Sequence, residues 1–165
     1  MSTELHRKTA PASVRCFVLT ISDSRTEEND TSGDAIAALL TADGHDLGGR
    51  ALVKDNPDAV RQVLTSRAGS VDVVITTGGT GITSRDSTYE AITSLLDKQL
   101  DGFGELFRML SFNEIGSAAM LTRACAGTLG TTAVFSLPGS EHAVRLGMTK
   151  LILPEMGHVV RELRR

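Results

Sequence analysis

The residues best suited to chemistry in this sequence lie in one segment, VDVVITTGGTGITSRD at 71–86. Its first half is rich in β-branched residues, which is typical of a strand buried in a parallel sheet. A glycine-rich loop follows, and such a loop ahead of a helix can bind a phosphate, because free N–H groups and the helix dipole both favour an anion. The loop residues predicted to contact the phosphate are Thr77, Gly78, Gly79, Thr80 and Gly81.

Two common phosphate-binding loops are excluded by the spacing. In a P-loop the last glycine is followed by Lys and then by Ser or Thr, whereas here Gly81 is followed by Ile82 and Thr83. A dinucleotide-binding fingerprint needs glycines that are farther apart. A tight turn without any ligand is the alternative interpretation of the same residues.

Two carboxylates lie beside this loop. Asp86 stands just before a helix expected at 87–96, and Asp55 follows an expected strand. An anion beside a phosphate makes sense mainly if a divalent cation lies between them, and Mg²⁺ prefers oxygen ligands and bridging phosphates. We therefore predict that Asp55 and Asp86 orient a metal ion. The alternatives are that Asp86 only caps the helix and that Asp55 is a solvated turn residue.

The elements that must position these residues alternate between strand and helix patterns, which predicts an α/β fold with a mostly parallel sheet. Strands are expected at 14–21, 46–53 and 71–77, with a hairpin formed by 122–127 and 131–137. Helices are expected at 32–43, 56–69, 87–96 and 141–153, the last of these stopped by Pro154 and followed by a short helix at 155–163.

Four of the expected strands end in small or acidic residues. These ends are Ser22-Asp23-Ser24, Lys54-Asp55, Thr77–Gly81 and Pro138-Gly139-Ser140. If the strands are parallel, the four ends meet at one edge of the sheet, where open α/β sheets bind ligands. We therefore add Ser22, Gly139 and Ser140 to the predicted site, with Ser140 either contacting a second phosphate or capping the next helix. Spacing and chemistry thus indicate an Mg²⁺-dependent site for a phosphorylated ligand.

Length and composition limit the classes of function. The 165 residues fit one domain, expected at 13–165, after a polar tail at 1–12 that is expected to be disordered. A net charge of −3 without a run of basic residues argues against nucleic-acid binding. The apolar run at 16–21 is too short for a signal peptide or a membrane span, so a cytoplasmic location is expected. Cys16 and Cys125 lie in strand-like runs and are interpreted as buried thiols of a reducing compartment.

The segment 100–112 contains three of the five phenylalanines. Its density of Phe, Leu and Met exceeds what one short helix can bury alone. This excess indicates a contact between subunits.

These motifs resemble those of the MoaB/MogA family of molybdenum cofactor biosynthesis proteins, which also occurs as the G domain of gephyrin. The resemblance runs from about residue 14 to residue 163. Its motifs are TTGGTGITSRD at 76–86, DGFGELFRMLS at 101–111 and LPGS at 137–140, supported by ENDTSG at 28–33 and KDN at 54–56. The ENDTSG and FRMLSF segments and the short length are most similar to the MoaB branch.

The resemblance implies a three-layer α/β/α sandwich around a mostly parallel sheet, the molybdopterin-binding fold, assembled as a homotrimer or homohexamer. It also implies molybdopterin binding and, in catalytic members, adenylation, in which molybdopterin and Mg-ATP give adenylyl-molybdopterin and pyrophosphate. The family's functional aspartates fall on Asp55 and Asp86, its glycine loop on Thr77–Gly81 and its phosphate-contacting serine on Ser140. Glu105, in the GFGE motif, is expected to line the pterin side. Other proteins of the pathway are possible partners.

Two other functions fit the same residues. A non-catalytic molybdopterin-binding or scaffold protein would use the same crevice to hand on an unstable pterin. Tubulin-like GTPases also carry a GGTG loop, but the short chain and the absence of their second domain argue against that class.

Overall fold

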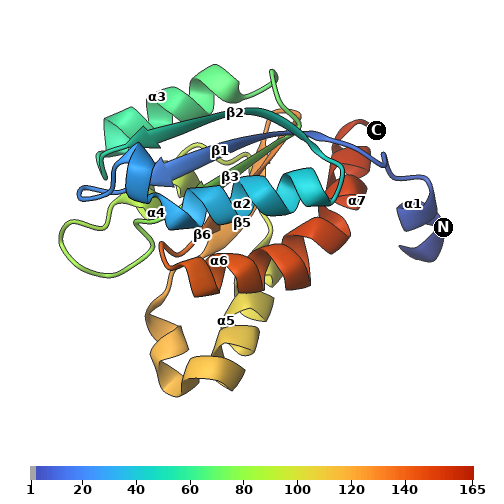
Figure 1. Cartoon of the computed structure of the whole chain (residues 1–165). Coiled ribbons are helices and arrows are strands. Elements are labelled where there is room, and N and C mark those ends of the chain that lie inside the picture. The colour runs from blue at the N-terminus through green and yellow to red at the C-terminus, as the bar shows by residue number, and fades with distance from the viewer. Residues whose placement is uncertain (1–2) are drawn as a thin grey trace.

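A six-stranded sheet forms the middle layer of the molecule, with helices on both faces (Figure 1). The computed structural model describes residues 3–165, apart from the side chain of His6. The strands are β1 (Arg15–Ile21), β2 (Asp46–Val53), β3 (Val73–Thr77), β4 (Lys98–Gln99), β5 (Cys125–Leu129) and β6 (Thr132–Leu137). The α-helices are α1 (Thr3–Lys8), α2 (Thr31–Ala42), α3 (Pro57–Arg67), α4 (Thr88–Thr93), α5 (Asp101–Ile115), α6 (Glu141–Gly147) and α7 (Leu153–Leu163). The predicted three-layer α/β/α sandwich is confirmed.

The strand order is β2-β1-β3-β6-β5-β4. The first four strands in this order are parallel, as the sequence predicts, because helical crossovers connect them. The predicted hairpin is confirmed as the antiparallel pair β5–β6, which turns at Gly130 with φ of 59°. Strand β5 starts at Cys125 and not at 122, and a short connection joins it to the 3₁₀ helix η2 (Gly116–Leu121). The two-residue strand β4 was not predicted.

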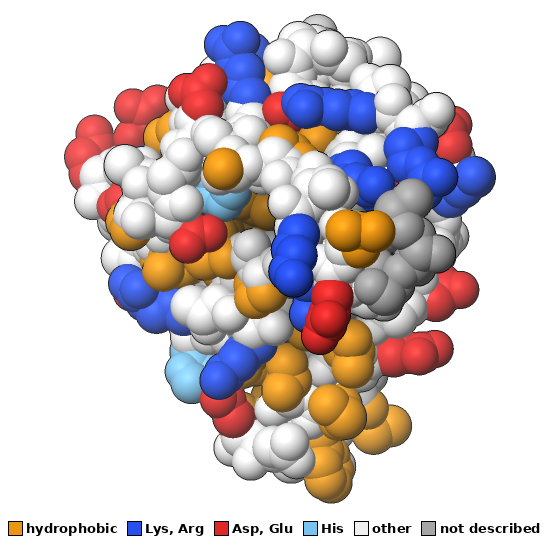
Figure 2. Space-filling view, turned by 90° about the vertical axis from the view of Figure 1, so that its right-hand side faces the viewer, with side chains coloured by type: hydrophobic (Ala, Val, Ile, Leu, Met, Phe, Trp, Pro, Cys, Tyr) orange, Lys and Arg blue, Asp and Glu red, His pale blue; other side chains and the backbone are white. Residues whose placement is uncertain are grey.

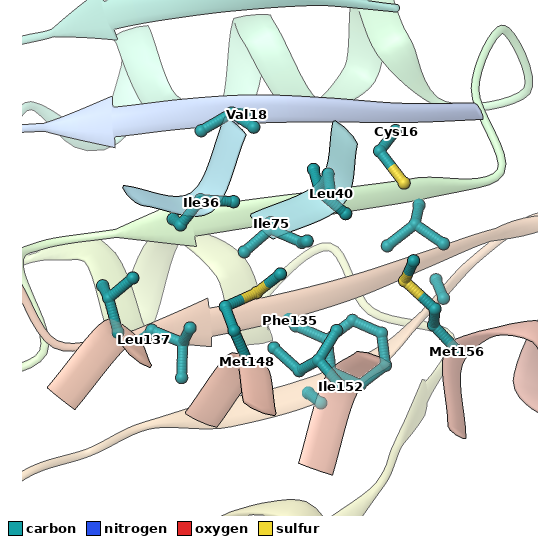
Figure 3. Packing of buried hydrophobic residues seen from close by; sticks show 14 of the residues in the cluster. Cys16, Val18, Ile36, Leu40, Ile75, Phe135, Leu137, Met148, Ile152 and Met156 are labelled. Atoms are coloured by element: carbon teal, nitrogen blue, oxygen red, sulfur yellow. The ribbon is translucent and has the colours of Figure 1, made fainter. Parts of the chain in front are cut away.

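Two apolar clusters hold the layers together, one on each face of the sheet. Strand β1 contributes to both, with Cys16 and Val18 on one face and Phe17 and Leu19 on the other. Figure 3 shows the first cluster, in which side chains of the strands meet those of α2 and of the C-terminal helices. The second cluster lies beneath α3 and α4. Burial on both faces explains why the central strands read as continuous apolar runs.

The C-terminal helical region differs from the prediction. Pro154 does not end the helix expected at 141–153; α6 continues through a π-helical turn (η3, Met148–Ile152) directly into α7. Pro154 lies in the first turn of α7. The π-helical turn just before it already departs from the regular i→i−4 bonding, which a proline cannot continue.

A short helix lies in the N-terminal segment, for which the sequence predicts a disordered tail at 1–12. Residues Thr3–Lys8 form α1, which packs on α7 and forms an ion pair from Arg7 to Glu155. Figure 1 shows α1 next to the C-terminal end of the chain. Residues 1 and 2 lie outside the described residues.

Helix α4 is shorter than the helix expected at 87–96 and covers only Thr88–Thr93. Across the described residues, every helix is too short or too polar to cross a membrane.

Candidate functional site

The carboxyl ends of the four parallel strands surround a cleft of about 520 Å³. The structure brings together in this cleft all the predicted site residues except Glu105. Its lining includes Ser22, Asp55, Thr77, Gly78, Gly79, Thr80, Gly81, Asp86, Gly139 and Ser140 from the prediction, together with Asp23, Arg25 and Arg85. Segments that are more than a hundred residues apart in the sequence therefore meet at one edge of the sheet.

The glycine loop is packed tightly against protein atoms. Gly78 and Gly79 have φ of 108° and 68°, a region that residues with side chains rarely adopt. A Cβ at Gly78 would lie 2.0 Å from the carbonyl oxygen of Ile21, and one at Gly79 would lie 1.9 Å from Thr88 Oγ1. The structure shows that the space beside Gly78 and Gly79 is filled by β1 and α4.

The N–H groups of this loop are used unequally. Gly78 donates its N–H to the carbonyl of Leu137 at 2.9 Å, so it continues the sheet and is not available to a phosphate. The Thr77 hydroxyl likewise donates to the carbonyl of Pro138 at 2.8 Å. The N–H groups of residues 79–81 have no acceptor within the described part of the chain. The possible phosphate cradle is therefore 79–81 and not 78–81.

Asp55 holds the start of α4. Its Oδ1 accepts hydrogen bonds from the Ser87 N–H at 3.3 Å and the Ser87 hydroxyl at 2.8 Å, with the Thr88 hydroxyl at 3.4 Å. Its Oδ2 has no donor among residues 3–165. Asp55 is thus not simply a solvated turn residue, because one oxygen is committed to the fold and the other is available.

Asp86, like Asp55, has one oxygen bonded within the fold and one oxygen available. Its Oδ2 accepts from the N–H and the hydroxyl of Thr83, at 2.9 and 2.6 Å. Its Oδ1 receives no hydrogen bond from any described residue. The N-cap position of α4 belongs to Ser87, so Asp86 is not the helix cap that was the alternative interpretation.

The donor set fits Mg²⁺ only with help from a ligand. Within the described residues, no group of three carboxylate, imidazole or thiol side chains could hold a metal ion by itself. Mg²⁺ is commonly held by one or two carboxylates together with substrate phosphates and water. Asp55 and Asp86, each with one available oxygen in the same cleft, match that pattern.

The two predicted serines have structural partners as well. Ser22 Oγ accepts from the N–H groups of Ser24 and Arg25, at 3.3 and 3.1 Å, and thereby fixes the turn after β1. Ser140 Oγ accepts from the Ala143 N–H at 3.2 Å and caps α6. Each hydroxyl can still donate its proton to a ligand in the cleft.

Three charged residues of the cleft were missing from the predicted site: Asp23, Arg25 and Arg85. Arg25 donates to the Ser32 hydroxyl at 2.8 Å, while Arg85 is highly exposed and lies 3.5 Å from Asp23. The available signal was position, because each follows a strand end or belongs to the glycine-loop segment. Both guanidinium groups therefore lie beside a carboxylate, since Arg25 Nη1 is also 3.7 Å from Oδ1 of the buried Asp30.

Glu105 lines a second cavity of about 470 Å³, together with Tyr89, Arg108, Thr122 and Arg123. The two cavities adjoin at the glycine loop, where the Thr80 hydroxyl lies 3.3 Å from that of Thr122. Arg123 also hydrogen-bonds to the carbonyls of this loop. The second cavity contains Cys125, whose pKa is raised to about 11, mainly by burial.

Comparison with known proteins agrees with this arrangement. Residues 17–158 match the family described as "Probable molybdopterin binding domain". Molybdenum cofactor biosynthesis protein B of Bacillus cereus is 54% identical over 100% of this chain and 99% of its own. A crystal structure of a molybdenum cofactor biosynthesis protein B has a TM-score of 0.90 at 54% identity, over 95% of this chain and 99% of that chain.

A more distant relative has the same fold. The tungsten cofactor synthesizing protein MoaB from Pyrococcus furiosus has a TM-score of 0.84 at 41% identity, over 94% of this chain and 100% of its own. Identity at this level covers nearly the full length of both chains. The chain therefore belongs to the MoaB/MogA family of molybdopterin-binding proteins, and its role lies in molybdenum cofactor biosynthesis.

Proposed function

We propose that this protein binds molybdopterin and adenylates it with Mg-ATP, releasing pyrophosphate. The observation that carries the proposal is the cleft at the strand ends. There the three N–H groups of 79–81, which have no acceptor among the described residues, lie in the same cavity as two carboxylates that each have one available oxygen. Such a set can bind phosphates and a metal ion together, which adenylyl transfer requires.

In this proposal the protein acts mainly by alignment. The terminal phosphate of molybdopterin is already an anion at neutral pH, so its attack on the α-phosphate of ATP needs no strong general base. The N–H groups of 79–81 and the guanidinium of Arg25 would hold the two phosphates in line and offset their charge. Bound Mg²⁺, held by Asp55 and Asp86, would add charge neutralisation at the phosphates. Neither carboxylate carries a proton in this scheme.

The second cavity would receive the pterin. It adjoins the glycine loop and offers both carboxylate and guanidinium groups, from Glu105 and Arg108, to the polar edge of a heterocycle. The proposal places this reaction in the cytoplasm, which agrees with two buried cysteines that are both free thiols.

The test is pyrophosphate release from purified protein, molybdopterin and Mg-ATP. Release that depends on all three supports adenylation. Tight molybdopterin binding without release, under conditions where a known adenylyltransferase is active, would instead identify a non-catalytic carrier or scaffold. GTP-dependent polymerisation would point to the tubulin-like alternative.

We also propose that the protein associates with copies of itself through one apolar face. Six large hydrophobic side chains on α5 and η2 are 47–77% exposed: Leu106, Met109, Phe112, Ile115, Met120 and Leu121. Figure 2 shows hydrophobic side chains gathered at the lower end of the molecule, where Figure 1 places these helices. A contiguous apolar patch on a soluble domain favours an interface. Sedimentation of Phe112→Asp against the unmodified protein tests this, and an unchanged mass would exclude this face.

A further inference from the structure

Arg123 lies outside the predicted site, in the short connection between η2 and β5, yet it contacts the glycine loop at several points. Its Nε and Nη2 donate to the carbonyl of Gly81, at 3.0 and 2.6 Å. Nη2 also donates to the carbonyl of Asp86 at 3.3 Å. The backbone N–H of Arg123 donates to the carbonyl of Thr80 at 2.8 Å.

These contacts join both ends of one loop. Gly81 and Asp86 are the first and last residues of the segment that carries the Asp86 carboxylate and Arg85. One guanidinium therefore bridges the loop across its base, from the side of the second cavity. The loop's internal bonds, from Thr83 to the Asp86 carboxylate, hold its tip but do not tie it to the rest of the protein.

The guanidinium is itself held in place by α4. Its carbon lies 5.0 Å from the centre of the Tyr89 ring, a favourable distance for a cation–π contact. It also forms an ion pair with Glu90, whose pKa is lowered chiefly by this hydrogen bond. Only 26% of the Arg123 side chain is exposed. A planar group with its donors directed in a fixed fork is well suited to this bridging, and a lysine is not.

We propose that Arg123 is a positioning residue of the site, which sets the place of the Asp86 carboxylate and of the N–H groups at 79–81 by closing the loop 81–86. This inference deepens the proposed adenylation and rests on it for its effect on rate. Its structural part, the ordering of the loop, is independent of any activity.

The first test is amide hydrogen exchange in the protein without ligand. Arg123→Ala is expected to raise exchange at the Thr83 and Asp86 amides about tenfold or more, because the opening of this loop alone becomes easier. Arg123→Lys is expected to restore little of the protection. Arg61→Ala is the matched control, since Arg61 also joins two elements, from α3 to Ser94 next to α4, without touching the loop. Unchanged exchange at both amides in Arg123→Ala, or an equal rise in the control, would overturn the inference.

The second test is a double-mutant cycle on the rate of pyrophosphate release. Arg123→Ala alone is expected to lower kcat by roughly 10- to 100-fold, the scale of a misplaced catalytic group. In an Asp86→Asn background the same change should cost clearly less than it does alone, because the part of its effect that acts through the Asp86 carboxylate is already lost. Fully additive losses would show that Arg123 does not act through Asp86. If the unmodified protein releases no pyrophosphate, the proposed adenylation fails while the exchange experiment still decides whether Arg123 orders the loop.

Discussion

The two ends of the same parallel strands carry similar charged residues and use them differently. At the amino end, Asp72 precedes β3 and both of its carboxylate oxygens are occupied. One accepts from the Arg15 N–H at 2.8 Å and the other from the Arg164 guanidinium at 2.7 Å. At the carboxyl end, Asp55 and Asp86 each commit one oxygen to the fold and leave the other without a donor among the described residues.

The carboxylates at the two ends differ in how much hydrogen-bonding capacity they leave for a ligand. A carboxylate with both oxygens paired contributes to stability and has little capacity left for a ligand. A carboxylate held by one oxygen is fixed in place and still able to bind a cation or a donor. Asp72, Asp55 and Asp86 are the same type of residue, and they differ in how many of their oxygens are already paired.

The largest expected effect at the carboxyl end comes from Asp86→Asn. The amide oxygen can keep the bonds from Thr83 while an NH₂ group replaces the available oxygen. Adenylation should fall by about 10²-fold or more, the scale of losing one preorganised electrostatic group. Molybdopterin binding should be retained, and pyrophosphate release together with a binding titration measures both. An unchanged rate would remove Asp86 from the mechanism.

The next effect is on stability and tests how tightly the cleft is built. Gly78→Ala should destabilise the fold by about 2 kcal/mol or more, because it adds a Cβ 2.0 Å from a backbone oxygen at positive φ. Gly44→Ala is the matched control, with φ of 84° and no atom within 4 Å of the added Cβ. It isolates the backbone strain, expected to cost about 1 kcal/mol. Urea denaturation measures both, and equal losses would show that the contact with Ile21 is unimportant.

The sequence predicts the position of the site better than its internal bonding. Strand ends rich in Gly, Ser and Asp indicated the cleft because parallel strands must end at one edge of the sheet. Which N–H groups are already used could not be predicted, since the bond from Gly78 to Leu137 depends on the pairing of β3 with β6. Arg123 was missed because it is far in the sequence from the carboxyl end of every parallel strand, although it contacts the loop after β3 in space. Glu105 falls in the neighbouring cavity for a similar reason, since it is carried by a helix and not by a strand end.

For the fold as well, the sequence does not predict features that depend on contacts between distant segments. Strand and helix patterns predicted the central elements, because burial on one or two faces leaves a periodic trace in the sequence. The π-helical turn before Pro154 depends on how α6 and α7 pack against the sheet. The ordering of α1 depends on its contact with α7. Neither the π-helical turn nor the helix α1 is predicted by a pattern in the residues around it.

A smaller effect is expected at the amino end of the strands. Asp72→Asn weakens the pairing with Arg164, which is half exposed, and keeps one acceptor for the Arg15 N–H. The expected loss of stability is therefore about 0.5–1 kcal/mol, with adenylation unchanged. Urea denaturation and pyrophosphate release measure the two quantities. A loss of activity without a loss of stability would contradict the division between the two ends.

The smallest expected effect is a difference in reactivity between the two buried thiols, Cys16 and Cys125, which report on different parts of the molecule. At the amino end of the strands, burial and then the charges of Asp72 and Asp46 raise the pKa of Cys16 to about 12. Beside the second cavity, burial raises the pKa of Cys125 to about 11. Because the neutral thiols are favoured in the fold, their contribution to stability is present below the ordinary pKa of 9.0 and is lost as the pH rises through 11 and 12. At pH 9 the thiolate fraction of Cys125 should exceed that of Cys16, and Cys125 lines a cavity whereas Cys16 is fully buried, so an alkylating reagent should label Cys125 first. Peptide mapping after timed alkylation measures the order. Faster labelling of Cys16 would mean that the amino end opens more readily than its paired carboxylates indicate.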